Sequence, residues 1–124
     1  MSGTSLAALE LAPGFGKGIS SPKALRERLK LSRERFAGIL GYSPRSLATW
    51  EKEGVISLNA LRSLEEVRSV YERTCRVAGT GEAARWLGAP NGELGGISPL
   101  EAIRLGRIAE VVRLLVLAEE GIPV

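Results

Sequence analysis

The sequence contains no histidine and a single cysteine, Cys75, and these two shortages exclude several classes of site. Structural zinc sites draw their ligands mainly from cysteine and histidine, so too few ligands are present for one. A disulfide framework needs paired cysteines, and a nucleophilic thiol is usually activated by a neighbouring base. We therefore expect a protein without catalytic residues, metal or cofactor. We also expect Cys75 to be a buried structural thiol in a reducing compartment.

Long hydrophobic runs are also missing. The longest, Val111 to Ala118, is interrupted by Arg113 and is too short to span a bilayer. The apolar stretch from Leu6 to Ala12 lacks the features of an export signal. The chain has 124 residues, of which 44% are hydrophobic and 25% charged, which predicts one domain or two very small ones that fold. We expect a soluble cytoplasmic protein that does not contact a membrane.

No convincing alternating pattern of a β-strand occurs, and the sequence predicts an all-α protein. Ser-Pro pairs and other hydroxyl caps mark helix starts, and glycines mark the ends. The last helix is apolar over most of its circumference, so we expect it to be buried on several sides. Residues 1–19, rich in Gly, Ser and Ala, are expected to be a flexible arm. The expected helices cover residues 21–30, 33–40, 44–54, 57–77, 82–87, 99–105 and 107–119.

One segment, Arg33 to Lys52, reads RERFAGILGYSPRSLATWEK and fits the pattern of a helix-turn-helix. Ala37 stands where the second helix crosses closely, and Gly41 stands where the tight turn needs a positive φ. Ser43 and Pro44 then start the second helix. The apolar surface between the two helices is supplied by Phe36, Leu40, Tyr42, Leu47 and Trp50.

The outward face of the second helix in this motif is polar and basic, which predicts contact with DNA. Arg45 lies in the first turn, where it can reach a guanine or a phosphate. The alternative is a helix-turn-helix that has lost DNA binding and serves as a scaffold. Residues 20–54 carry eight Lys and Arg against four Glu, a net +4, as a phosphate-binding surface requires. The expected DNA-binding residues are Arg33, Arg35, Ser43, Arg45, Ser46, Thr49 and Lys52.

The second half of the chain differs in character. Residues 80–124 carry four Arg against six Glu, a net −2. Residues 86–103 read WLGAPNGELGGISPLEAI, followed by the helix breaker Gly106 and the closing sequence Glu119-Glu120-Gly121-Ile122. Together with the upstream motif, this order resembles the Xre–MbcA–ParS antitoxin family over nearly all of residues 20–124. The first nineteen residues have no counterpart in the family pattern.

The resemblance implies a type II antitoxin whose partner is a RES-domain toxin that consumes NAD. It implies that the C-terminal segment blocks the active site of the toxin, while the N-terminal domain binds operator DNA and represses the operon. The chain would then consist of the arm at 1–19, a helix-turn-helix domain with a long connecting helix at 20–78, and a toxin-binding domain at 79–124. Because a helix-turn-helix usually reads two half-sites, we expect a homodimer.

The end of the chain offers a physical route to inhibition. A site for a dinucleotide pyrophosphate presents cationic groups, and a flexible acidic segment with an apolar tip could occupy it as a mimic. The alternative is a segment that frays into solvent. For the chain as a whole, the alternative function is a dimeric helix-turn-helix repressor without a toxin partner. The expected toxin-binding residues are Glu119, Glu120, Gly121, Ile122, Pro123 and Val124.

Overall fold

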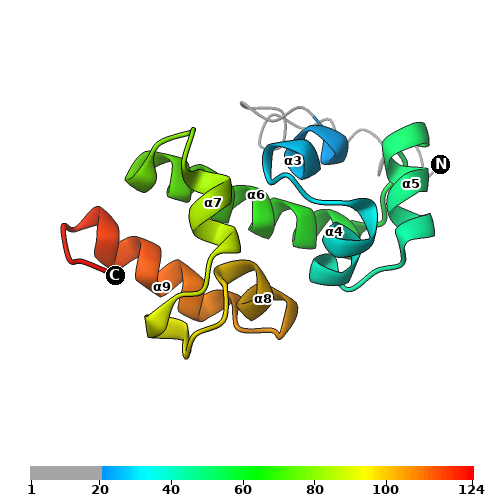
Figure 1. Cartoon of the computed structure of the whole chain (residues 1–124). Coiled ribbons are helices and arrows are strands. Elements are labelled where there is room, and N and C mark those ends of the chain that lie inside the picture. The colour runs from blue at the N-terminus through cyan, green and yellow to red at the C-terminus, as the bar shows by residue number, and fades with distance from the viewer. Residues whose placement is uncertain (1–20) are drawn as a thin grey trace. The chain divides into compact units, whose positions relative to one another are not determined.

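The computed structural model describes residues 21–124, and the expected flexible arm at 1–19 lies outside them. The described residues form helices and contain no strand, which confirms the all-α fold class (Figure 1). One short element escaped the sequence analysis, the 3-10 helix η1 (Gly92–Leu94). The α-helices are α3 (Pro22–Arg28), α4 (Arg33–Leu40), α5 (Pro44–Glu53), α6 (Leu58–Ala78), α7 (Ala83–Gly88), α8 (Pro99–Arg104) and α9 (Ile108–Glu119).

Serine side chains cap the N-termini of most of these helices, as expected. The hydroxyls of Ser21, Ser32, Ser43 and Ser98 each accept a hydrogen bond from a backbone N–H three residues later. Ser57 does the same for α6, at 3.2 Å from the amide of Ala60. Proline follows the capping serine in α3, α5 and α8, where its missing N–H would have no helical partner. The starts of these helices are therefore set by local chemistry.

The first helix is shorter than the sequence predicted. It was expected to reach Lys30 but ends at Arg28, because Lys30 adopts a left-handed conformation with φ of +60°. The amide of Leu31 then donates to the carbonyl of Arg26 at 3.2 Å and closes the helix end. Glycine usually fills such a position, so the pattern gave no sign of this turn.

The described chain divides into two compact units. The boundary falls within α6, between Arg68 and Ser69. The last turns of α6 belong to the second unit, in which Thr74 and Ala78 line one cavity with residues of α7 and α9. The structural division therefore precedes the Gly79–Gly81 break, while the division of function at residue 79 remains a prediction.

Each unit has its own apolar core. In the first, Leu25, Phe36 and Leu47 are completely buried, so α3, α4 and α5 share one core. In the second, the buried residues include Val70, Tyr71 and Thr74 of α6 together with Ala83, Leu87, Leu94, Leu100, Ala102, Ile103, Val111, Leu114 and Leu115.

The expectation that α9 is buried on several sides holds only in part. Its face with Val111, Leu114 and Leu115 is buried, but Val112 and Val116 stay half-exposed. Within its unit α9 packs mainly against α8 and η1, which cover too little of its circumference to bury both faces.

Candidate DNA-binding and toxin-binding sites

Helices α4 and α5 are joined by the short turn Gly41–Ser43, and the turn has the geometry that the sequence predicted. Gly41 has φ of +84°, and the amide of Tyr42 donates to the carbonyl of Ala37 at 2.9 Å. Ala37 is completely buried at the crossing. The rings of Tyr42 and Trp50 meet edge to face at 5.1 Å between centroids. Trp50 is thus part of the packing between the helices, as expected.

The outward face of α5 keeps its polar groups in solvent. Arg45, Thr49 and Lys52 are exposed, as is Arg35 on α4, and Ser46 is half-buried. In the described part of the chain, the guanidinium of Arg45 and the ammonium of Lys52 have no hydrogen-bond or ion-pair partner. Both charges are therefore available to an incoming anion.

All three expected DNA-binding hydroxyls, those of Ser43, Ser46 and Thr49, already have internal partners. Ser43 accepts the amide of Ser46 at 3.1 Å and donates to the Ser46 hydroxyl at 3.2 Å. The Thr49 hydroxyl donates to the carbonyl of Arg45 at 3.1 Å. Ser43 is therefore committed to capping α5, whereas the Thr49 oxygen can still accept a hydrogen bond.

Arg33, a third expected phosphate contact, is part of a small ion cluster that the sequence analysis missed. Its Nε donates to Glu51 Oε1 at 3.0 Å, and Arg26 Nε donates to Glu51 Oε2 at 2.7 Å. The Glu51 side chain is only 3% exposed. Burial by itself would raise the pKa of the Glu51 carboxyl, but the hydrogen bonds from the two arginines outweigh burial and hold that pKa below its ordinary value. Arg33 thus has a structural partner and shares its remaining N–H groups with solvent.

In the second unit, the expected toxin-binding segment begins with an anchored carboxylate. Glu119, the last residue of α9, accepts a hydrogen bond from Arg73 at 3.0 Å and lies 3.5 Å from Arg76. Both arginines lie on α6. The charge of Glu119 is therefore compensated within the chain, whereas the exposed Glu120 has no ion-pair partner among the described residues.

The residues after α9 follow a defined turn. Gly121 has φ of +86°, its amide donates to Ala118 O at 3.0 Å, and the amide of Ile122 donates to Leu117 O at 3.0 Å. This pair of bonds is the Schellman arrangement that ends many helices. The segment was expected to be flexible, but up to Ile122 its backbone is tied to α9.

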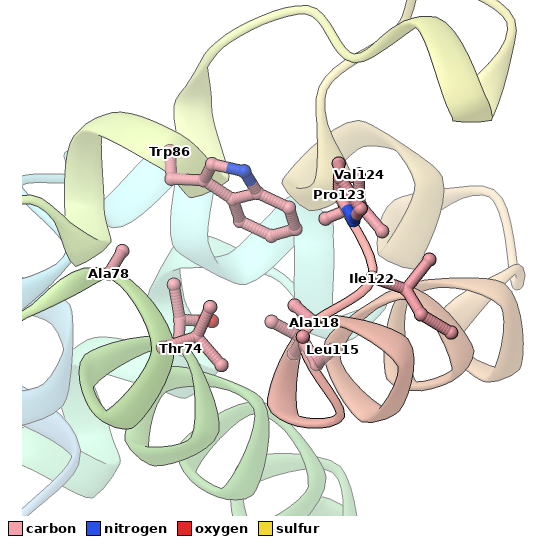
Figure 2. A pocket seen from close by; sticks show the side chains of 10 residues that line it. Thr74, Ala78, Trp86, Leu115, Ala118, Ile122, Pro123 and Val124 are labelled. Atoms are coloured by element: carbon pink, nitrogen blue, oxygen red, sulfur yellow. The ribbon is translucent and has the colours of Figure 1, made fainter.

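A cavity of about 330 Å³ lies between this segment, the end of α6 and Trp86 of α7. Pro123 and Val124 stand across the cavity from the Trp86 indole, and Leu115 and Ala118 of α9 form its floor (Figure 2). Thr74 also lines it, but its hydroxyl is satisfied by the carbonyl of Val70 at 2.7 Å. Trp86 was recognised in the sequence only as part of a motif, and its place beside the chain end was not foreseen.

The described residues also bear on the thiol, the metal site and the membrane span that the sequence analysis considered. Cys75 is half-buried, which corrects the expectation of a buried thiol; its neighbour Thr74 takes the fully buried position of that turn. Among the residues described, no group of His, Cys, Asp and Glu could hold a metal ion. None of the helices described there is both long and apolar enough to cross a bilayer.

The turn-rich segment between α7 and α8 is closed by Asn91. The backbone N–H of Asn91 donates to the carbonyl of Ile97, and the backbone carbonyl of Asn91 accepts from the N–H of Gly96, both at 3.0 Å. Its side-chain oxygen accepts the amide of Glu93 at 2.8 Å and caps η1. Asparagine, glycine and proline in this stretch thus build one compact loop that leads into the Ser98 cap of α8.

Comparisons with known proteins bear on both units. A family model described as the antitoxin Xre/MbcA/ParS C-terminal toxin-binding domain matches residues 76–121, which lie within the second unit. Comparison with curated proteins gives no match. A chain in the crystal structure of the M. tuberculosis MbcT–MbcA toxin–antitoxin complex is similar in structure, with a TM-score of 0.66 and 30% sequence identity. The match covers 83% of this chain and 94% of that chain. With the toxin-binding domain and this likeness over most of its length, the chain belongs to the Xre/MbcA/ParS family of type II antitoxins.

Proposed function

We propose that this antitoxin neutralises a RES-domain toxin that consumes NAD, by blocking the toxin active site with the C-terminal segment 119–124. The observation that carries the proposal is the match of residues 76–121 to a toxin-binding domain, since these residues include α9 and the turn from which the segment extends. The family acts by binding, and the same regulatory, non-enzymatic role is proposed for this chain.

The chemistry of the segment supports this mode of inhibition. Glu120 is exposed, and the following Ile122 is also exposed at 46%. A pocket that binds NAD must hold both an anionic pyrophosphate and flat apolar rings. A carboxylate next to an apolar side chain offers the same two features, so the segment can compete for cationic and apolar contacts in one site.

We further propose that α4 and α5 form a helix-turn-helix that binds operator DNA and represses the operon of the antitoxin. The role is supported by the buried Ala37, by the left-handed Gly41, and by Arg45 and Lys52, whose charges have no partner within residues 21–124. A homodimer would place two copies of α5 on two half-sites of the operator. A cytoplasmic location fits both proposed partners.

Co-expression with the toxin encoded beside this gene tests the first proposal. Full-length antitoxin should rescue growth, restore cellular NAD and copurify with the toxin. Deletion of residues 120–124 should remove most of the rescue while the truncated protein stays folded, because these residues follow the last helix. Full neutralisation by the truncated chain would overturn the blocking role. Operator repression without any toxin partner would instead favour the alternative, a plain dimeric repressor.

A further inference from the structure

We propose that Arg73 and Arg76 are positioning residues: by holding Glu119, they fix the direction in which residues 120–124 leave α9. The inference rests on the proposed role of this segment in toxin binding and adds to it the residues that control its conformation. It concerns only the second compact unit, in which both arginines and the segment lie.

The first argument is electrostatic. Glu119 and Glu120 stand at the C-terminal end of α9, where the helix dipole presents partial negative charge and disfavours carboxylates. The last turn of α9 contains no basic residue that would offset them. The compensating charge comes instead from α6, through Arg73 and Arg76. Without that help, the end of α9 would be expected to fray.

The second argument is the geometry of the ion pairs. The Arg73 and Glu119 side chains are 32% and 29% exposed, so their pair is partly shielded from solvent. Arg76 is 61% exposed and lies 3.5 Å from the second carboxylate oxygen. The two guanidiniums thus face different oxygens of one carboxylate, which restrains its position more than a single exposed pair would.

The third argument is the path of the chain after Glu119. The turn at Gly121 is closed by the amide of Ile122 on the carbonyl of Leu117, two residues before Glu119. Pro123 and Val124 then stand opposite the indole of Trp86. A carboxylate fixed at the last helical residue therefore keeps intact the turn on which the direction of the segment depends.

Preorganisation would strengthen toxin binding without adding a contact. A segment that already has its bound direction loses less conformational freedom when it enters a pocket. In this proposal, loss of the arginine charges releases the segment and weakens binding through the conformation of the segment, not through a lost contact of the arginines with the toxin. This separates a positioning residue from a contact residue.

The test is a cycle of variants measured against the purified cognate toxin. The double variant Arg73→Gln/Arg76→Gln and the single variant Glu119→Gln are prepared in the full chain and in a chain ending at Glu119. In the full chain each should raise the dissociation constant about 2- to 5-fold, the range of partly exposed ion pairs. In the shortened chain the arginine substitutions should have no further effect. Hydrogen exchange at the Ile122 amide of the free, full-length antitoxin should become faster in the same variants.

Arg85→Gln serves as the control, because it removes an exposed arginine paired with Glu82 in the same unit. It should change neither the dissociation constant nor the exchange of Ile122. If the shortened chain binds as tightly as the full chain, the proposed role of the segment fails, and the positioning role fails with it. If shortening weakens binding but the arginine substitutions do not, or weaken both chains equally, the positioning role alone is overturned.

Discussion

Arg26 Nε lies 2.7 Å from Glu51 Oε2, and this ion pair joins α3 to α5 at the edge of the first core. Replacement of Glu51 by Gln removes the charge that faces both Arg26 and Arg33. Because the Arg26 side chain is only 13% exposed, its guanidinium would be left poorly solvated. We expect the free energy of unfolding to fall by about 1–3 kcal/mol, measured by urea denaturation.

The matched control for that substitution is Glu53→Gln on the same helix. Glu53 is exposed, so its replacement should change stability by less than about 0.5 kcal/mol. Equal losses from the two substitutions would mean that the buried carboxylate is not held by its arginines.

The same cluster predicts a dependence of stability on pH. The pKa of the Glu51 carboxyl is lower in the folded than in the unfolded chain, where it has its ordinary value of about 4.3. Its contribution is therefore fully present above that value and is lost as the pH falls through the folded pKa. The difference in unfolding free energy between the wild type and Glu51→Gln should shrink on acidification below about pH 4. A constant difference from pH 7 to pH 3 would contradict the assignment.

Lys30 predicts a stabilising substitution. Its φ of +60° is unfavourable for a residue with a Cβ atom, so Lys30→Gly should raise the free energy of unfolding by about 0.5–1 kcal/mol.

Gly41→Ala is the reverse experiment at another left-handed position. An added Cβ there would meet no atom within 4 Å, so the loss of about 1 kcal/mol should be conformational rather than steric. Thermal unfolding measures the change in stability of both variants. Destabilisation by Lys30→Gly would contradict the prediction that its left-handed conformation is unfavourable.

The sequence predicted the local features of the fold but not the contacts between residues that are far apart in the chain. The Ser43-Pro44 start of α5 and the turn at Gly41 depend on residues close in the chain, and both were predicted correctly. The pairs Arg26–Glu51 and Arg73–Glu119 join residues far apart in sequence. Charged residues are frequent on helix surfaces, so no spacing identifies which of them meet. The place of Trp86 beside the chain end depends likewise on how α6, α7 and α9 pack.

The exposed face of α5 carries the final prediction, on DNA. Arg45→Ala should weaken binding to the operator about 10- to 100-fold, the loss expected for an arginine that reads a base edge. The same change should leave toxin neutralisation intact, because Arg45 lies in the first compact unit and the toxin-binding domain lies in the second. Fluorescence anisotropy with the operator and growth rescue by co-expression measure the two outcomes.

Lys52→Gln distinguishes a base contact from a phosphate contact on the same helix. Lys52 lies in the last turn of α5, so we expect it to meet the DNA backbone rather than a base. Its loss should weaken operator and unrelated DNA alike and reduce the slope of log K against log salt by about 1. Arg45→Ala should instead reduce the preference for the operator over unrelated DNA. If neither substitution changes DNA binding, α4 and α5 are a scaffold, and repression must depend on another surface of the antitoxin.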